Sequence, residues 1–121
     1  MSRFYNVRGF IDCDYPELEK IREIVRGSRE GPEASLLEPD TFDLYTAGWL
    51  YQERRMNWVA HAFFGGSMRR PGVDLIFSHV TSISEEIPDA EGVFFIESDE
   101  GDNQRWIMSH GRVNTLHGKG F

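Results

Sequence analysis

Residues Phe4 to Cys13 alternate between two sets of side chains. One set is mainly apolar and the other mixes polar with aromatic residues: Tyr5, Val7, Gly9, Ile11 and Cys13 against Phe4, Asn6, Arg8, Phe10 and Asp12. A period of two with aromatic and branched residues predicts a β-strand with one buried face.

A helix is predicted directly after this strand. Asp14 and Glu17 stand three residues apart with Pro16 between them, which is the pattern of a capping box at a helix N-terminus. Apolar residues then recur at helical spacing at Leu18, Ile21, Ile24 and Val25. Gly27 is expected to end the helix.

The middle of the chain is predicted to contain a loop and a hairpin. Residues 27–43 are interrupted by Gly31, Pro32 and Pro39, so we expect a long loop. Two aromatic-rich runs follow, residues 44–52 and 57–64, and the four residues between them suit an antiparallel hairpin. The second run is apolar on both faces and favours a central strand, with Trp58 buried.

A second helix and three more strands are predicted in the rest of the chain. Gly65, Gly66 and Ser67 are expected to end the strand before them, and a helix follows that carries Val73, Ile76, Phe77, Val80 and Ile83. Strands are expected over 92–97 and 105–109 around a polar turn at 98–104, with an edge strand at 112–114. Residues 115–121 are expected to fray.

These elements predict one α+β domain over residues 1–121. Two helices on one face of an antiparallel sheet of about five strands bury the apolar stripes most simply. The order strand, helix, strand, strand, helix, strand, strand predicts a two-layer, ferredoxin-like arrangement with an extra strand.

Size and cysteine content limit the kind of protein this is. A chain of 121 residues supports a single core. Cys13 is the only cysteine, so no intramolecular disulfide forms and a reducing compartment fits best. The N-terminus lacks the apolar segment of a signal peptide, and no apolar run approaches the ~20 residues that span a bilayer. We therefore expect a cytoplasmic protein.

The charge of the chain favours a cationic partner. A net charge of -7 disfavours nucleic acid and anionic membranes, which both carry negative charge. Acidic residues are frequent from Glu85 to Gln104, a stretch without Lys or Arg. We predict that Glu97, Asp99, Glu100 and Asp102 form a negative partner-binding surface. The alternative is that these acids only keep the protein soluble.

Aromatic residues supply a second part of the predicted interface. Trp49 and Tyr51 share a face with Tyr45 if all three lie on one strand. If the helices cover the opposite face, Trp49 and Tyr51 are exposed and available as interface anchors.

No catalytic, metal or cofactor site is predicted. The histidines, His61, His79, His110 and His117, lie in none of the usual metal-ligand motifs. His61 is expected to pack within its strand and His79 to flank the second helix. Ser67, Ser78 and Cys13 lie in no nucleophile elbow, and Cys13 is expected to be a small buried residue.

One segment offers an alternative function. The run from Gly65 to Pro71 places glycines before a helix N-terminus, with Arg69 and Arg70 beside it. Such a turn can hold an anion, so a small anion-binding or enzymatic domain is the alternative hypothesis. A homodimer formed through the exposed sheet face is a third possibility.

Several runs of the sequence resemble small bacterial immunity proteins of polymorphic toxin systems. They are Gly48 to Tyr51, Asn57 to Gly65, Gly72 to Ile76, Glu91 to Ile96, and Arg105 with Trp106. The resemblance implies a cytoplasmic protein that binds and blocks a cognate toxin, for instance one from a contact-dependent growth inhibition system. Many such toxins are nucleases with basic clefts, which an acidic inhibitor would fit. The resemblance implies no catalytic residues.

Overall fold

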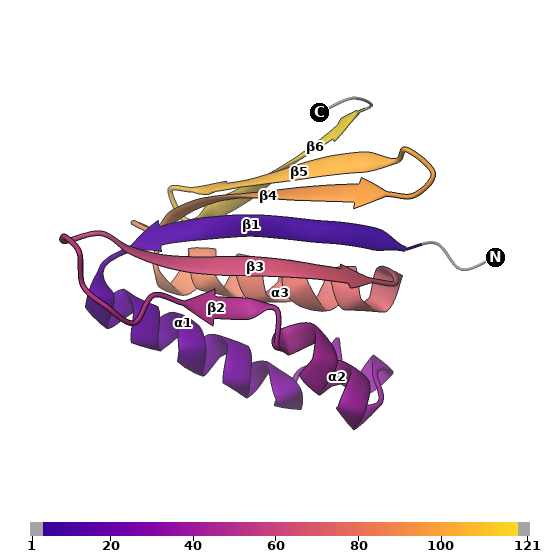
Figure 1. The fold of residues 1–121 in the computed structure, drawn as a ribbon, viewed down its shortest axis with the longest axis horizontal. Coiled ribbons are helices and arrows are strands. Elements are labelled where there is room, and N and C mark those ends of the chain that lie inside the picture. Colours follow the sequence, from indigo (N-terminus) through magenta and orange to yellow (C-terminus); the bar gives the residue numbers. More distant parts are fainter. Residues whose placement is uncertain (1–3, 119–121) are drawn as a thin grey trace.

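The computed structural model describes residues 4–118, which form a six-stranded antiparallel sheet and three α-helices (Figure 1). The elements in chain order are β1 (Tyr5–Cys13), α1 (Tyr15–Gly27), the 3-10 helices η1 (Ser28–Glu30) and η2 (Ala34–Leu36), α2 (Pro39–Thr46), β2 (Trp49–Tyr51), β3 (Ala60–Met68), α3 (Arg70–Glu86), β4 (Glu91–Ser98), β5 (Asn103–Ser109) and β6 (Arg112–Gly118).

The sheet has the strand order β2-β3-β1-β4-β5-β6, and every neighbouring pair is antiparallel. The order β2-β3-β1-β4, with helices between β1 and β2 and between β3 and β4, is that of a ferredoxin-like fold. β5 and β6 extend this core as a meander. The predicted α+β class and two-layer arrangement are confirmed, with six strands where about five were expected.

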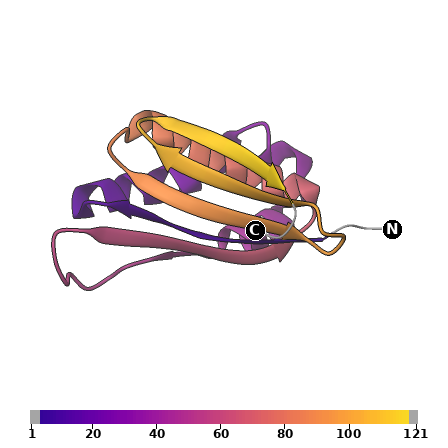
Figure 2. The same ribbon diagram turned by 90° about the horizontal axis from the view of Figure 1, so that it is seen from above.

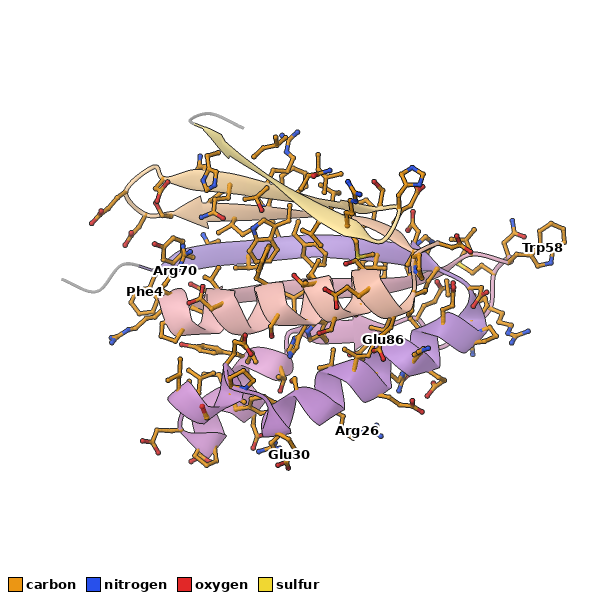
Figure 3. The ribbon with its side chains drawn as sticks, turned by 180° about the vertical axis from the view of Figure 1, so that it is seen from behind. Phe4, Arg26, Glu30, Trp58, Arg70 and Glu86 are labelled. Atoms are coloured by element: carbon orange, nitrogen blue, oxygen red, sulfur yellow. The ribbon has the colours of Figure 1, made fainter. Side chains whose placement is uncertain are left out.

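Helices α1 and α3 cover the same face of the sheet, as the view from behind shows (Figure 3). α1 begins with the predicted capping box: the Glu17 amide donates to Asp14 Oδ1 at 2.8 Å, and the Asp14 amide donates to Glu17 Oε1 at 2.9 Å. Its apolar stripe buries Leu18, Ile21 and Val25 against the sheet.

A row of aromatic side chains crosses the helix-covered face of the sheet. Trp49, Phe64, Phe94 and Trp106 occupy matching positions on β2, β3, β4 and β5. On β1, the matching position is Gly9, which pairs with both Phe64 and Phe94. Because Gly9 has no side chain, Trp49 reaches across it, and its ring centroid lies 6.0 Å from that of Phe94. This row forms the centre of the core.

No helix covers the other face of the sheet, and a row of apolar residues runs across it. Five strands contribute one residue each to this row: Leu50, Phe63, Phe10, Val93 and Ile107. A charged row lies beside it, where Arg8 pairs with Glu97 and the Arg105 guanidinium stacks over the Phe95 ring. We call this surface the open face.

The structure corrects the prediction for residues 27–52. The expected long loop at 27–43 contains η1, η2 and the first half of α2, and the expected strand at 44–52 is reduced to Trp49–Tyr51. Pro39 occupies the first turn of α2, where a backbone N–H has no acceptor within the helix, so its absence in proline loses no hydrogen bond. Phe42 and Tyr45 lie three residues apart and pack with Leu75 of α3 in a small second cluster, which stabilises α2.

Two further strand boundaries differ from the prediction. β3 runs through Gly65, Gly66 and Ser67, which were expected to end it, because these residues pair with β1. β6 extends to Gly118, so residues 115–118 are paired with β5 and are not a frayed tail. The rest of the predicted tail, residues 119–121, lies outside the described residues. A two-residue turn at His110 and Gly111, both with positive φ, sets the register of β6.

Candidate functional site

The acidic run between Glu85 and Gln104 is divided between the two ends of the molecule. Glu85 and Glu86 end α3, and Glu91 begins β4. Glu97 lies at the other end of β4, next to the turn that contains Asp99. Ser98 lies seven positions after Glu91 along β4, which corresponds to ~23 Å at ~3.3 Å per residue. The acidic run therefore contributes to two separate surfaces, and the four acids predicted to bind a partner, Glu97, Asp99, Glu100 and Asp102, all lie at the same end of the molecule.

The first surface is the hairpin tip, which we define as residues 98–102 between β4 and β5. The Ser98 side chain accepts hydrogen bonds from the amides of Glu100, at 3.3 Å, and Asp102, at 2.7 Å. Gly101 takes the positive φ that the turn requires. Asp99, Glu100 and Asp102 are exposed there, as predicted, whereas Glu97 lies on the open face and pairs with Arg8.

The second surface borders a groove between α1 and α3, with a volume of about 790 Å³. Apolar residues from both sides form part of its lining, namely Ile24, Pro32 and Phe77. Acidic residues contribute four positions: Glu33, Asp74, Glu85 and Glu86. Among the described residues that line it, none is Lys or Arg. We call this feature the acidic groove; Figure 3 shows the face on which it lies, with Glu86 on α3.

Arg22 of α1 and Arg70 of α3 are directed away from the acidic groove or bound at one end of it. The Arg22 guanidinium of α1 lies 4.7 Å from the centroid of the Tyr51 ring, on the β2 side of the helix. Arg70 pairs with Asp74 at 3.2 Å, which offsets the charge at that end. Within residues 4–118, no ion pair involves Glu33, Glu85 or Glu86. Three of the four carboxylates that line the groove are therefore not offset by an ion pair within the described residues.

Trp49 and Tyr51 do not form the exposed anchors that the sequence analysis predicted. Trp49 is only 5% exposed, because β2 directs it toward the helices and not toward the open face. Tyr51 points to the same side, and its partial burial raises the pKa of its hydroxyl to about 12, an effect that Arg22 and Arg26 partly oppose. Leu50, between them, is the β2 residue that faces solvent.

Trp58 shows the reverse error, since it was expected to be buried and is 87% exposed. β3 begins only at Ala60, opposite Cys13, the last residue of β1. Residues before Ala60 extend past the end of β1 and have no neighbouring strand to cover them. Trp58 therefore projects from the segment between β2 and β3, at one end of the molecule (Figure 3).

The segment Gly65 to Pro71 is not the glycine-rich turn on which the anion-site hypothesis for Arg69 and Arg70 was based. The glycines of that segment lie within β3, so no glycine-rich turn precedes the helix. The Arg69 guanidinium lies over the Phe4 ring, and that of Arg70 lies 5.9 Å from the Tyr5 ring centroid besides pairing with Asp74. These contacts give both arginines a structural role at the start of α3.

His79 is a buried polar residue of the core, although the sequence suggested only a flanking position. The indole N–H of Trp49 donates to His79 Nδ1 at 3.1 Å, so Nδ1 carries no proton. Nε2 lies 2.7 Å from Ser28 Oγ and donates to it, while the Ser28 hydroxyl donates to the carbonyl of Val25 at 2.6 Å. Burial lowers the pKa of His79 to about 4, which keeps the ring neutral.

This network joins Ser28 and His79 but does not make a nucleophile and base. A base must have a free nitrogen lone pair facing the hydroxyl, as in a Ser–His pair. Here the lone pair of the ring is on Nδ1 and is occupied by Trp49. The network instead fixes α1, β2 and α3 relative to one another, at the floor of the acidic groove.

The remaining titratable candidates have local partners. His61 Nδ1 lies 2.7 Å from Asp12 Oδ1 on the open face, where the ring is half-exposed. Cys13 is buried, and desolvation together with Glu17, Asp14 and Asp12 raises the pKa of its thiol to about 12. In residues 4–118, no cluster of three or more His, Cys, Asp or Glu residues is arranged to hold a metal ion.

The acidic groove has no signature in the sequence. Glu33 lies in the segment expected to be a loop, and Asp74 is isolated from other acids in the sequence. Packing of α1 beside α3 brings Glu33 to the helix that carries Asp74, Glu85 and Glu86, and no spacing in the sequence signals that packing.

Over the described part of the protein, none of the helices has both the length and the apolar character to cross a lipid bilayer. No known protein family, curated protein or solved structure matches this chain.

Proposed function

We propose that this protein binds a cationic segment of another protein in the acidic groove and neutralises it, as an immunity protein neutralises a bacterial toxin. The observation that carries the proposal is the composition of the groove: its lining contains four carboxylates and several apolar residues, and no Lys or Arg among the described residues. A groove of this kind fits side chains that are both long and positively charged.

The chemistry of Lys and Arg explains the fit. Their aliphatic stems pack on apolar surface while the charged end remains near water or a carboxylate. Ile24 and Phe77 offer that surface, and Glu33, Glu85 and Glu86 offer the carboxylates. A volume of about 790 Å³ is large enough for several side chains.

The hairpin tip supports the same proposal in a different way. Asp99, Glu100 and Asp102 are exposed at the far end of β4, and the whole chain carries a net charge of -7. A negative field of this kind attracts a basic partner over a distance of about a Debye length and raises its association rate. The tip would guide the encounter, and the groove would provide the contacts.

A nuclease toxin is the partner that this chemistry fits best. A nuclease holds the phosphate backbone with Lys and Arg in its cleft. An acidic protein that binds those same residues blocks the cleft without any catalysis of its own. Under this proposal the protein acts in the cytoplasm, where it protects the cell that makes it.

The test is co-expression with the product of the adjacent upstream gene, followed by pull-down and titration. We expect a complex whose association rate falls as ionic strength rises. Replacement of two of the four groove acids, Glu85→Lys with Glu86→Lys, should lower the affinity at least ~100-fold, because two attractive charge contacts are replaced by repulsion.

A control with the same net charge separates the groove from general electrostatics. Glu23→Lys with Glu91→Lys changes two exposed acids that do not line the groove, and we expect less than ~5-fold loss of affinity. Equal losses in the two double variants would show that only net charge matters and would overturn the groove as the binding site. Absence of any complex with the neighbouring product would overturn the immunity function.

A further inference from the structure

The segment between β2 and β3 presents apolar side chains to solvent in a way that the fold itself does not need. We call residues 52–59 the tryptophan loop. Met56 is 89% exposed and Trp58 is 87% exposed, and both are more exposed than any other large apolar residue described. The loop extends beyond the end of the sheet (Figures 1 and 2).

The base of this loop is held by a defined set of hydrogen bonds. The Tyr15 hydroxyl accepts from the Met56 amide at 3.2 Å and from Gln52 Nε2 at 3.0 Å. Gln52 also accepts from the His61 amide at 3.1 Å and donates to the Arg54 carbonyl at 2.8 Å. The Arg55 guanidinium stacks over the Tyr15 ring. The main chain is therefore anchored to α1 and β3 while the tip remains uncovered.

An anchored loop with uncovered side chains is suited to binding. A preformed backbone lowers the entropy that is lost when a complex forms. Trp, Met and Arg are the side chains most enriched at the centres of protein interfaces. Leu50 and Phe63 on the neighbouring strands are exposed as well, so apolar surface continues from the loop onto the open face.

The chain itself carries a surface of complementary chemistry. The tryptophan loop combines apolar side chains with Arg54 and Arg55, which outnumber its one acid, Glu53. The acidic groove combines an apolar lining with Glu33, Glu85 and Glu86, which make no ion pair within residues 4–118. The charges of the two surfaces are opposite, and both contain apolar area to bury.

We propose that the tryptophan loop of one copy inserts into the acidic groove of a second copy. Loop and groove are different surfaces, so the contact is head-to-tail and not isologous. The inference rests on the proposed function in one respect, because it uses the same groove. Self-association would then cover the groove until a cationic partner displaces the loop. Without a partner, the protein would be a self-associated form whose groove is occupied.

The experiment measures mass by light scattering and sedimentation over a range of protein concentrations. We expect wild-type protein to form species of twice the monomer mass or more, and to dissociate as salt concentration rises. Two double variants each disable one of the two surfaces. Met56→Ala with Trp58→Ala removes the large apolar side chains of the tryptophan loop, and Glu85→Lys with Glu86→Lys reverses two charges of the acidic groove. Each should be monomeric alone.

Mixing these two variants gives the decisive result. The loop-deficient variant keeps its groove and the groove-deficient variant keeps its loop, so an equimolar mixture should form 1:1 heterodimers and nothing larger. Leu36→Ala with Leu44→Ala, which changes two exposed leucines outside both surfaces, should associate like wild type. Far-UV circular dichroism verifies that every variant is folded.

The outcomes separate this inference from the proposed function. A wild-type protein that remains monomeric at all concentrations overturns self-association, as does a loop-deficient variant that associates like wild type; neither result affects partner binding by the groove. Conversely, head-to-tail association together with no binding of a basic partner would overturn the proposed function and leave the self-association intact.

Discussion

The Trp49 indole N–H donates a hydrogen bond of 3.1 Å to Nδ1 of His79, and this bond links the shortest strand of the sheet to the longest helix. Trp49 reaches His79 because β2 directs it toward the helices, where it also contacts Phe64 and Phe94. The bond fixes the tautomer of His79, so that Nε2 carries the proton and donates to Ser28. Three segments that are distant in the sequence thus depend on one imidazole ring.

Replacement of Trp49 by Phe should destabilise the fold. The substitution removes the N–H donor and leaves Nδ1 of His79 buried without a partner, which costs about 1–3 kcal/mol. Chemical denaturation monitored by circular dichroism measures the change in free energy of unfolding. Trp58→Phe serves as the matched control, because Trp58 is exposed, and its effect should stay within about 0.5 kcal/mol. Equal stability of the two variants would contradict the assigned hydrogen bond.

His79 should make the protein less stable in mild acid. The pKa of its ring is lowered from 6.5 to about 4 by burial, so the unfolded chain binds a proton at a higher pH than the folded chain does. The stabilising contribution is complete above pH 6.5 and is lost as the pH falls toward about 4. The total loss is about 3 kcal/mol, at about 1.4 kcal/mol per pH unit.

The measurement compares the free energy of unfolding at several pH values for wild type and His79→Gln. The glutamine variant should lack the part of the pH dependence between 6.5 and 4, while His117→Gln, an exposed position, should keep it. Parallel curves for wild type and His79→Gln over that range would mean that His79 is not the group responsible.

The sequence was sufficient for the elements that combine a clear period with a marked start. α1 has a capping box and an apolar stripe, and β1 has strict alternation over nine residues. α2 was missed because it is short, with eight residues, and because Pro39 suggested a loop. Its stability comes from Phe42 and Tyr45 packing near α3, a long-range contact that local patterns do not contain.

The same limit explains the errors at the candidate sites. Alternation placed Trp58 in a strand, but β3 can extend only as far as its neighbour β1. β1 ends at Cys13, opposite Ala60, because α1 begins at Tyr15. Alternation also placed Trp49 and Tyr51 on one face correctly without showing which face the helices cover. Only the hairpin tip was predicted from sequence, since it depends on local turn chemistry alone.

Gly9→Ala should destabilise the core strongly. A Cβ at this position would lie 2.4 Å from the Val93 carbonyl oxygen and 2.5 Å from Cδ2 of Phe94, so β4 would have to move. Displacing a neighbouring strand in a packed core costs about 1–3 kcal/mol or more. Gly27→Ala is the matched control, because its added Cβ meets nothing within 4 Å and its φ of -68° suits alanine. Thermal denaturation of both variants measures the effect, and we expect Gly27→Ala to be neutral or slightly stabilising.

The Cys13 thiol should be nearly inert in the folded protein. Desolvation and the nearby carboxylates of Glu17, Asp14 and Asp12 raise its pKa from 9.0 to about 12, so its thiolate fraction near neutral pH falls by about a thousandfold relative to an exposed thiol. A thiol-reactive chromogenic disulfide should therefore label the native protein only as fast as it unfolds, and label it rapidly in denaturant.

A second variant tests whether slow labelling is caused by the surroundings of Cys13 or by low reactivity of the reagent. Ser67→Cys, placed in a Cys13→Ser background, puts a thiol at an exposed position on the open face, and it should react rapidly without denaturant. Fast labelling of Cys13 in native wild-type protein, at a rate like that of the Ser67 position, would mean that the end of β1 opens readily. Slow labelling of Cys13 together with fast labelling at position 67 would show that the surroundings of Cys13 protect it. The carboxylates and burial disfavour its thiolate form, and the core keeps the reagent out.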